Sequence, residues 1–129
     1  RKIMIKLKFY KCEHCGNVVV KLIDKDVPVL CCGEIMTEIV ANSKEAATEK
    51  HLPVVKVGNN IVEVKVGEVS HPMEENHYIN FIAVETDKGY KLVSLYPGNE
   101  PIAKVYVGEE IVKTVYEYCN LHGLWKTEI

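Results

Sequence analysis

The sequence predicts a mainly β protein made of a small metal-stapled N-terminal domain and a β-sandwich of seven strands. Short apolar runs of strand length recur from residue 53 onward, with turn-forming residues between them. Four of the five cysteines lie within the first 32 residues, in a segment too small to bury a core of its own. The expected domains are residues 1–40 and residues 41–129.

The first domain contains two expected strands. Apolar residues alternate with mostly basic ones over residues 3–9, which is typical of a half-buried strand. A second β-rich run covers residues 17–23. After this domain, the polar stretch Asn42–Lys50 is the only good helical segment, and Asn42 or Ser43 can serve as its N-cap.

Hairpins dominate the expected second domain. Gly58-Asn59-Asn60 and Asp87-Lys88-Gly89 are turn sequences between strand-like runs, and a cluster of turn residues occupies 97–101. The expected strands cover residues 54–57, 61–66, 79–86, 90–96, 103–107 and 111–118. Short strands at this near-regular spacing predict a sandwich of about seven strands.

The charge and the N-terminal segment limit the classes of partner. The net charge is -2 with a pI near 6.2, and no basic block is available to neutralise nucleic-acid phosphates or an anionic membrane. No apolar run approaches the roughly 20 residues of a membrane span. The first residues lack the apolar core of a signal peptide, so we expect a cytoplasmic protein with reduced cysteines.

Cys12 and Cys15 form a C-x-x-C knuckle, in which a tight turn eased by Gly16 can bring two thiolates onto one ion. The adjacent pair Cys31-Cys32 supplies two more. Four thiolates around a tetrahedral site suit iron or zinc and exclude magnesium and calcium. Because neighbouring cysteines must splay to reach one ion, we expect a distorted tetrahedron. Buried cysteines without a metal are the less favoured alternative, since this small unit needs a staple.

A second set of candidate ligands lies in the second domain, where four of the five histidines accompany the last cysteine. The fifth histidine, His14, lies within the knuckle and is expected to face solvent. Taken singly, each histidine is more often a surface residue than a ligand. Together they predict a metal site on the loops of one sandwich, with His51, His71, His77, Cys119 and His122 as candidate ligands.

The composition of this second set indicates redox chemistry. Four neutral imidazoles and one thiolate are compatible with iron, copper or zinc. Five ligands leave one coordination position open, and a thiolate opposite an open position donates electron density to the metal, as in haem-thiolate enzymes. Zinc hydrolases, in contrast, typically use three protein ligands. A redox function is therefore favoured over hydrolysis.

The segments that carry these residues resemble the desulfoferrodoxin family, the two-iron class of superoxide reductase. YKCEHCGN and CCGEIM resemble its desulforedoxin-like N-terminal domain, while EKHLPV, SHPMEENHYI and YCNLHGLWK resemble its three catalytic segments. The resemblance covers nearly the whole chain. It departs at Phe81, where the family often has tryptophan, and we expect only a packing change there.

The resemblance implies two iron ions per chain. One would be a distorted rubredoxin-like iron, with zinc as a substitute, and the second would lie in a plane of histidines with Cys119 as its axial ligand. The ligands of the first would be Cys12, Cys15, Cys31 and Cys32, and the equatorial ligands of the second His51, His71, His77 and His122. Glu49 matches a glutamate that can occupy the sixth position in the oxidised resting state, and Lys50 matches a lysine beside the open position.

The activity that the resemblance implies is one-electron reduction of superoxide to hydrogen peroxide at the iron held by four histidines and one cysteine. The iron held by four cysteines would be an auxiliary electron-transfer centre. The implied fold of the second domain is an immunoglobulin-like sandwich. The implied assembly is a homodimer supplied by a rubredoxin-like electron donor. The alternatives are a non-catalytic iron electron carrier, which needs no open coordination position, and a zinc-stapled binding module, which would be colourless.

Overall fold

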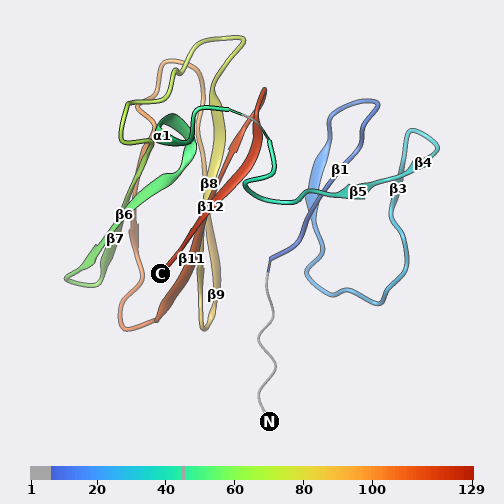
Figure 1. The fold of residues 1–129 in the computed structure, drawn as a ribbon. Coiled ribbons are helices and arrows are strands. Elements are labelled where there is room, and N and C mark those ends of the chain that lie inside the picture. Colours follow the sequence, from blue (N-terminus) through green and yellow to red (C-terminus); the bar gives the residue numbers. More distant parts are fainter. Residues whose placement is uncertain (1–6, 45) are drawn as a thin grey trace. The chain divides into compact units, whose positions relative to one another are not determined.

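The computed structural model describes residues 7–44 and 46–129, and the chain divides into two compact units, residues 1–40 and 41–129. Strands dominate both units, and α1 is the only helix among the described residues (Figure 1). The mainly β fold class is therefore confirmed. Most of the strand expected at residues 3–9 falls outside the described residues.

The first unit is built from very short strands. β1 pairs with β2 and β5 in an antiparallel sheet, while β3 and β4 form a separate hairpin. The bounds are β1 Phe9–Lys11, β2 Val18–Val20, β3 Leu30–Cys31, β4 Glu34–Ile35 and β5 Thr37–Glu38. The run expected over residues 17–23 is shortened, because Leu22 and Ile23 are exposed. Three strands here, β3 to β5, were not identified from the sequence.

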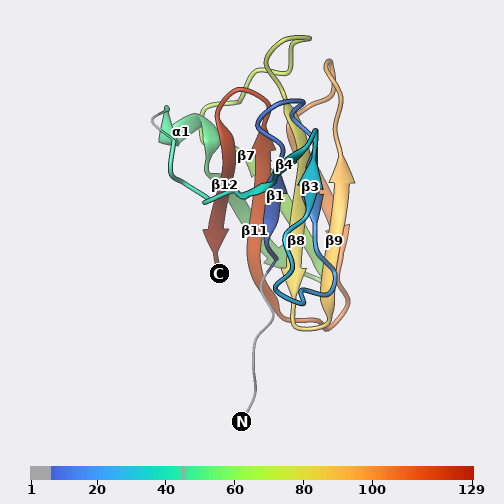
Figure 2. The same ribbon diagram turned by 90° about the vertical axis from the view of Figure 1, so that its right-hand side faces the viewer.

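The second unit is a sandwich of seven antiparallel strands in two sheets (Figures 1 and 2). One sheet has the order β10-β7-β6, with β6 Pro53–Gly58, β7 Ile61–Val66 and β10 Ile102–Tyr106. The other has the order β12-β11-β8-β9, with β8 Ile79–Thr86, β9 Gly89–Ser94, β11 Val112–Cys119 and β12 Gly123–Glu128. This arrangement confirms the predicted seven-stranded sandwich.

Buried side chains that alternate with more exposed ones along β7 contribute to the core between the two sheets. Val62, Val64 and Val66 of β7 are fully buried and belong to one apolar cluster with side chains of β8 and β11. Burying each such side chain stabilises the fold by roughly 1.5–3 kcal/mol. Cys119, the last residue of β11, belongs to the same cluster and has no exposed surface. Its thiol therefore lies within the core at the end of a strand.

The two predicted hairpins, β6–β7 and β8–β9, are confirmed, and both have turn-forming residues between their strands. Asn59 and Asn60 both adopt positive φ angles, 52° and 67°, and join β6 to β7 in a two-residue turn. Asparagine tolerates this left-handed backbone better than most residues, because its short side chain can bond locally. The β8–β9 hairpin likewise pairs Thr86 with Gly89 across two turn residues.

The helix expected over Asn42–Lys50 is wrong in extent. α1 covers only Thr48–His51, and its N-cap residue Ala47 makes no capping side-chain bond. Asn42 has a φ of 62°, which no helix accepts, and its backbone amide donates to the Leu124 carbonyl of β12. Edge pairing to β12 therefore competes successfully with helix formation, because a short polar helix gains little in isolation. No helix within the described residues is long and apolar enough to cross a membrane.

β12 was not among the strands identified from the sequence. It follows the turn at residues 120–122 and pairs with β11 from Thr114↔Glu128 to Cys119↔Gly123. The start of β12 coincides with the end of the ligand-bearing segment, and the expected strands end before it, at residue 118. Gly123, at a φ of 80°, allows the chain to reverse into this strand.

Glu117 is an unusual member of the core face of β11. It is fully buried, and neither carboxyl oxygen has a hydrogen-bond partner among the described residues. Burial alone raises the pKa of its carboxyl to about 9 from an ordinary value of 4.5. The folded state therefore holds this proton at pH values where the unfolded chain has released it.

This proton makes the stability depend on pH. The contribution of the neutral carboxyl is complete below pH 4.5 and is lost as the pH rises through about 9. We predict that Glu117→Gln becomes progressively more stable relative to the parent as the pH is raised within this window. Thermal unfolding of parent and variant across the window measures this, with Glu109→Gln, an exposed glutamate, as the control. A pH-independent difference would contradict the assignment.

Candidate metal centres

Four cysteine sulfurs converge in the first unit. The Sγ atoms of Cys12, Cys15, Cys31 and Cys32 all lie within 4.8 Å of one another, and those of Cys15 and Cys31 are 3.6 Å apart. Two come from the knuckle after β1 and two from the β3–β4 hairpin. Four thiols at this spacing, unbridged by any disulfide, suit a tetrahedral thiolate site for iron or zinc.

Backbone conformation explains how adjacent cysteines reach one site. Cys31 is the last residue of β3, while Cys32 and Gly33 form the two-residue turn into β4 at φ angles of 54° and 76°. A positive φ is uncommon for a side chain like that of Cys32 and reorients its Cβ relative to the preceding strand. The splay that the sequence predicted is therefore produced by a hairpin turn.

Backbone amides also prepare this site for thiolates. The amide of Cys15 donates to Cys12 Sγ at 3.4 Å and lowers the pKa of the Cys12 thiol to about 6. The neighbouring sulfurs of Cys15 and Cys12 raise the pKa of Cys32 to about 12. Four sulfurs this close cannot all ionise in isolation, whereas a bound cation would stabilise four thiolates together.

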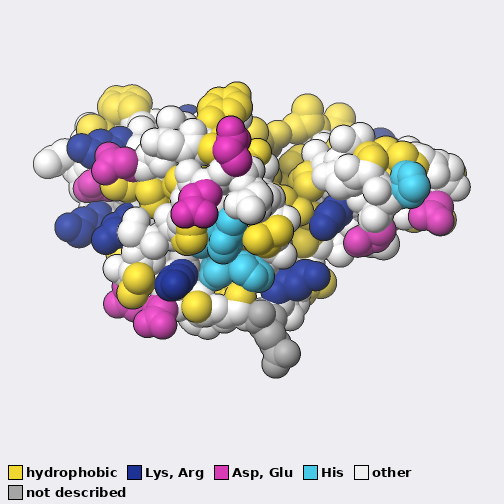
Figure 3. All heavy atoms as spheres, turned by 90° about the horizontal axis from the view of Figure 1, so that it is seen from above, with side chains coloured by type: hydrophobic (Ala, Val, Ile, Leu, Met, Phe, Trp, Pro, Cys, Tyr) yellow, Lys and Arg dark blue, Asp and Glu magenta, His cyan; other side chains and the backbone are white. Residues whose placement is uncertain are grey.

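The second set of candidate ligands gathers at one end of the sandwich (Figure 1). His51 ends α1, His71 and His77 lie in the connection from β7 to β8, and Cys119 and His122 flank the turn between β11 and β12. His51 and His71 are buried, and the other two histidines are partly exposed. Figure 3 shows histidine side chains gathered at the surface of this face. The site therefore reaches from the core to solvent.

The four imidazoles form a closed ring. Neighbouring ring centroids are 4.7 Å apart for His51 and His71, 4.8 Å for His71 and His77, 5.2 Å for His77 and His122, and 4.9 Å for His122 and His51. Each ring is nearly perpendicular to the next, with interplanar angles between 75° and 88°. Each neighbouring pair is therefore T-shaped rather than stacked, an arrangement that is compatible with four nitrogens sharing one ion.

In three of these rings, no N–H group of the described residues donates a hydrogen bond to the Nε2 atom. Nδ1 of His51 is 2.7 Å from the Ala47 carbonyl, and Nδ1 of His71 is 2.7 Å from the Pro72 carbonyl, so both Nδ1 atoms carry the proton. Their Nε2 lone pairs then face each other at 3.2 Å. Nε2 of His77 is buried without a hydrogen-bond partner among the described residues. A cation would satisfy all three nitrogens, so the residues fit a metal.

Burial favours the protonation state that metal binding needs. It lowers the pKa of His71 to about 4 and also lowers the pKa of His51 and His77. These imidazoles are therefore neutral near pH 7. Burial raises the pKa of the Cys119 thiol, although the amides of His122 and Leu121 donate to its sulfur and oppose this shift.

Cys119 completes the cluster from the core side. Its Sγ lies 3.9 Å from Nδ1 of His122, and ligand atoms of both residues lie within 4.8 Å of those of His51 and His77. His71 is not in this mutually close group and joins it through His51, whose Nε2 lies 3.2 Å from its own. The structure thus gathers one buried sulfur and four imidazoles from three separate chain segments.

Trp125 and Gly67 support this site and were not identified from the sequence as site residues. The Trp125 indole stacks on His51 at a centroid distance of 4.9 Å and donates from Nε1 to the His122 carbonyl at 3.1 Å. Gly67 lies at the C-terminal end of α1, where its amide donates to the carbonyl of the C-cap residue Leu52. Both hold histidine-bearing segments in place, and neither role has a local sequence signal.

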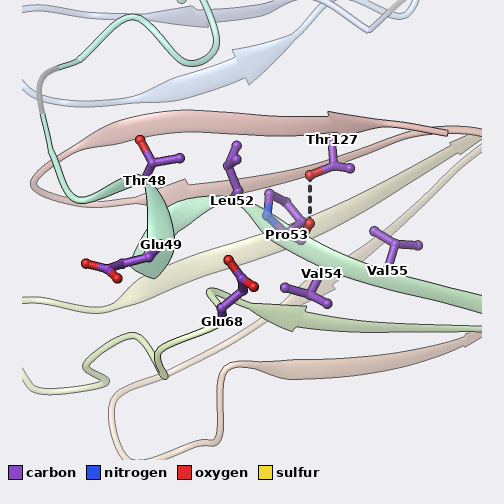
Figure 4. A pocket seen from close by; sticks show the side chains of 8 residues that line it. All are labelled: Thr48, Glu49, Leu52, Pro53, Val54, Val55, Glu68 and Thr127. Carbon is purple, nitrogen blue, oxygen red and sulfur yellow. Dashed lines mark hydrogen bonds between the residues drawn. The ribbon is translucent and has the colours of Figure 1, made fainter.

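Glu49 and Lys50 are both exposed in α1, directly before His51. The positive charge of Lys50 contributes to the lowered pKa of His51 and His77, so it acts close to the ring. Glu49 instead lines a groove beside Glu68 and the edge of β6, and none of the histidines lines that groove (Figure 4).

Comparison with known proteins agrees with this geometry. The family model for desulfoferrodoxin matches residues 43–128. The chain belongs to the desulfoferrodoxin family. A desulfoferrodoxin from Syntrophotalea carbinolica is 45% identical over 124 residues, covering 95% of this chain and 97% of the relative.

Two solved structures extend the comparison. A superoxide reductase from Treponema pallidum matches with a TM-score of 0.81 and 33% identity, covering 96% of this chain and all of that one. A superoxide reductase (1Fe-SOR) from Giardia intestinalis matches with a TM-score of 0.55 and 34% identity, covering 63% of this chain and 97% of its own. This member of the desulfoferrodoxin family thus shares nearly its full length with the first protein and a smaller part with the second.

Gly67 gives a test of how tightly the α1 segment is held. A Cβ added there would lie 2.5 Å from the Val69 carbonyl oxygen and 2.6 Å from that of Lys50, at a φ of 84°. Backbone must therefore shift, whereas Gly98 has a similar φ of 92° and open space around its Cβ position. We predict that Gly67→Ala costs about 1–3 kcal/mol of stability more than Gly98→Ala and also lowers metal retention. Thermal unfolding and metal analysis measure both, and equal effects would contradict this account.

Proposed function

We propose that this protein is a superoxide reductase, which reduces superoxide by one electron to hydrogen peroxide at a non-haem iron. The iron would be held by His51, His71, His77, Cys119 and His122. The observation that carries this proposal is a core-buried sulfur within 4.8 Å of nitrogens of His51, His77 and His122, which belong to a ring of four imidazoles that reaches the surface. The names of the similar structures support the same activity.

The chemistry of the ligand set favours iron with one exchangeable position. Five donors leave a six-coordinate ion one open site, and softness of the thiolate suits a redox metal. When bound, the ferrous ion supplies the one electron that the reaction needs, and a thiolate ligand increases its electron density. The balanced reaction combines superoxide, one electron and two protons into hydrogen peroxide.

Two residues beside the proposed iron site would have separate roles, one in attracting superoxide and one in binding the oxidised iron. Superoxide is an anion, while the whole protein has a net charge of -2, so attraction must be local. Lys50 is exposed beside the ring and provides that positive charge. Glu49, two residues before His51, is the proposed sixth ligand of the oxidised resting state. In the structure Glu49 lines a groove together with Glu68.

The first unit would hold a second iron in the thiolate site of Cys12, Cys15, Cys31 and Cys32, as an auxiliary electron-transfer centre. Zinc is an alternative occupant, because four thiolates accept either metal. Both centres together give two iron ions per chain. The close sulfurs and the amide donors support a thiolate site of this kind.

The proposed partners follow from the activity and from the surface of the first unit. A rubredoxin-like protein would return the electron consumed in each cycle, and removal of superoxide in the cytoplasm would be a detoxification function. The first unit exposes large apolar side chains, including Leu22, Ile23, Leu30 and Ile35 at 61–76% of their surface. Such exposure is costly for a free surface and supports a homodimer formed through this unit.

The reaction itself is tested by its stoichiometry. Reduction yields one hydrogen peroxide for each superoxide consumed and oxidises the iron, whereas dismutation yields one for every two. We expect the reductase ratio when iron-loaded, prereduced protein is mixed with a known amount of superoxide. A protein that is fully active with zinc in the histidine centre, or that only exchanges electrons with a donor, would contradict the proposal.

Cys119→Ser tests the role of the buried sulfur. Serine is a poor donor to iron, so we predict loss of superoxide reduction while the absorption of the thiolate site in the first unit is retained. Cys32→Ser is the matched control, because it should disturb that absorption and leave the histidine centre in place. Activity at the parent level in Cys119→Ser would show that this sulfur is not a ligand.

Lys50→Ala tests local electrostatic attraction. Removing one positive charge beside the ring should slow the bimolecular reaction with superoxide by about tenfold, with iron content unchanged. The rate should also depend less on ionic strength. Pulse radiolysis over a range of salt concentrations measures both, and Lys104→Ala on β10, also an exposed lysine, is the control. An unchanged rate and salt dependence would refute the proposed role.

A further inference from the structure

The Asn120 side chain joins two segments that carry candidate ligands. Asn120 directly follows Cys119, and its Oδ1 accepts a hydrogen bond from the Tyr78 amide at 2.9 Å. Its Nδ2 donates to the Asn76 carbonyl at 3.1 Å. An amide nitrogen donates and a carbonyl oxygen accepts, so these partners determine the orientation of the side-chain amide. One side chain therefore binds the peptide groups on both sides of His77.

The β-sheet explains why a side chain makes these contacts. The pairing of β11 with β8 shifts register between Tyr118 and Cys119, and Cys119 pairs with Ile79 at the end of the ladder. One residue further, the Asn120 amide still donates to the Tyr78 carbonyl at 3.2 Å. The chain then enters the turn before β12, and the acceptor for the Tyr78 amide is the side-chain oxygen rather than a backbone carbonyl. Asn120 thus prolongs the ladder where the backbone leaves it.

A second set of hydrogen bonds, within its own loop, also restrains the backbone of His77. Its amide donates to the Glu74 carbonyl at 3.0 Å, and the Glu74 amide donates to the His77 carbonyl at 2.9 Å. The residue is therefore enclosed between a tight turn and the Asn120 side chain. Its Nε2, buried and without a hydrogen-bond partner among the described residues, is directed by the backbone rather than by any polar contact of the ring.

We propose that Asn120 is a positioning residue of the histidine centre, which sets the distance of His77 from Cys119 and His122. The identity of the metal in this inference rests on the proposed function, whereas the contact does not. Without the side-chain amide of Asn120, the two peptide groups that flank His77 would lose these hydrogen bonds, and the Glu74 turn and the backbone bond from Asn120 to the Tyr78 carbonyl would remain. One of the five donors would then be free to move away from the other four.

The chain offers a matched control in Asn42. Its Oδ1 accepts from the Lys126 amide at 2.8 Å, and its Nδ2 donates to the Lys126 carbonyl at 3.3 Å. This asparagine makes the same two kinds of side-chain bond to the backbone, but the residue that it holds is not a candidate ligand. Its replacement by alanine should lower stability at least as much, because alanine is also disfavoured at the φ of 62° found there, without moving a histidine.

The decisive experiment compares Asn120→Ala with Asn42→Ala as iron-loaded full chains. We expect Asn120→Ala to lose iron from the histidine centre to a chelator at least about tenfold faster than the parent, the lower limit for residues that orient ligands. Its iron absorption band should also shift. Asn42→Ala should retain the parent rate and band although its unfolding temperature is lowered at least as far. In metal-free protein, the Tyr78 amide should exchange its hydrogen faster only in Asn120→Ala.

A conservative variant separates the two bonds. Asn120→Asp keeps an acceptor for the Tyr78 amide but places a carboxylate against the Asn76 carbonyl, so iron loss should be intermediate between parent and alanine variant. If Asn120→Ala keeps the parent rate of iron loss and the parent band, the inference is overturned and Asn120 only stabilises the fold. A parent that fails to reduce superoxide would refute the proposed function alone, since iron retention would still report on Asn120.

Discussion

The antiparallel pairing of β11 with β8 and β12 is the interaction on which the histidine centre depends. Cys119 pairs with Ile79 on one side and with Gly123 on the other, at the last step of both ladders. The segments that immediately precede those two partners carry His77 and His122. Backbone hydrogen bonds of one sheet therefore bring three candidate ligands, His77, Cys119 and His122, together without a metal. This would reduce the conformational entropy that the chain loses when a metal binds.

The other sheet supplies the remaining two donors. His51 lies in α1, directly before β6, and His71 follows the end of β7, so the ring of imidazoles spans the end of the sandwich. Closing the ring buries nitrogens that have no protein donor, and the two facing Nε2 atoms of His51 and His71 repel each other without a cation. The apolar core thus stabilises an arrangement whose polar end a bound metal would complete.

Sequence patterns predicted the elements that depend on local chemistry. The alternation in Ile61–Val66 and Ile79–Thr86 and the turn residues Asn59 and Asn60 indicate strands and hairpins, because side-chain period and turn conformation are properties of a few neighbouring residues. The polar stretch around Asn42 was misjudged as helix, since its amide and side chain are used by β12, which is 82 or more positions away in the chain. The helix propensity of these residues could not reveal that pairing with β12 competes with helix formation.

Residue type and spacing by themselves determined the two donor sets of this protein, four thiols and a group of four imidazoles with one thiol, because softness and charge are intrinsic to the side chains. Their arrangement was decided only by tertiary structure. The ring of His51, His71, His77 and His122 and the close approach at Gly67 arise from strand pairings and packing between distant segments. Such contacts carry no local signal, since each depends on where the rest of the chain has folded.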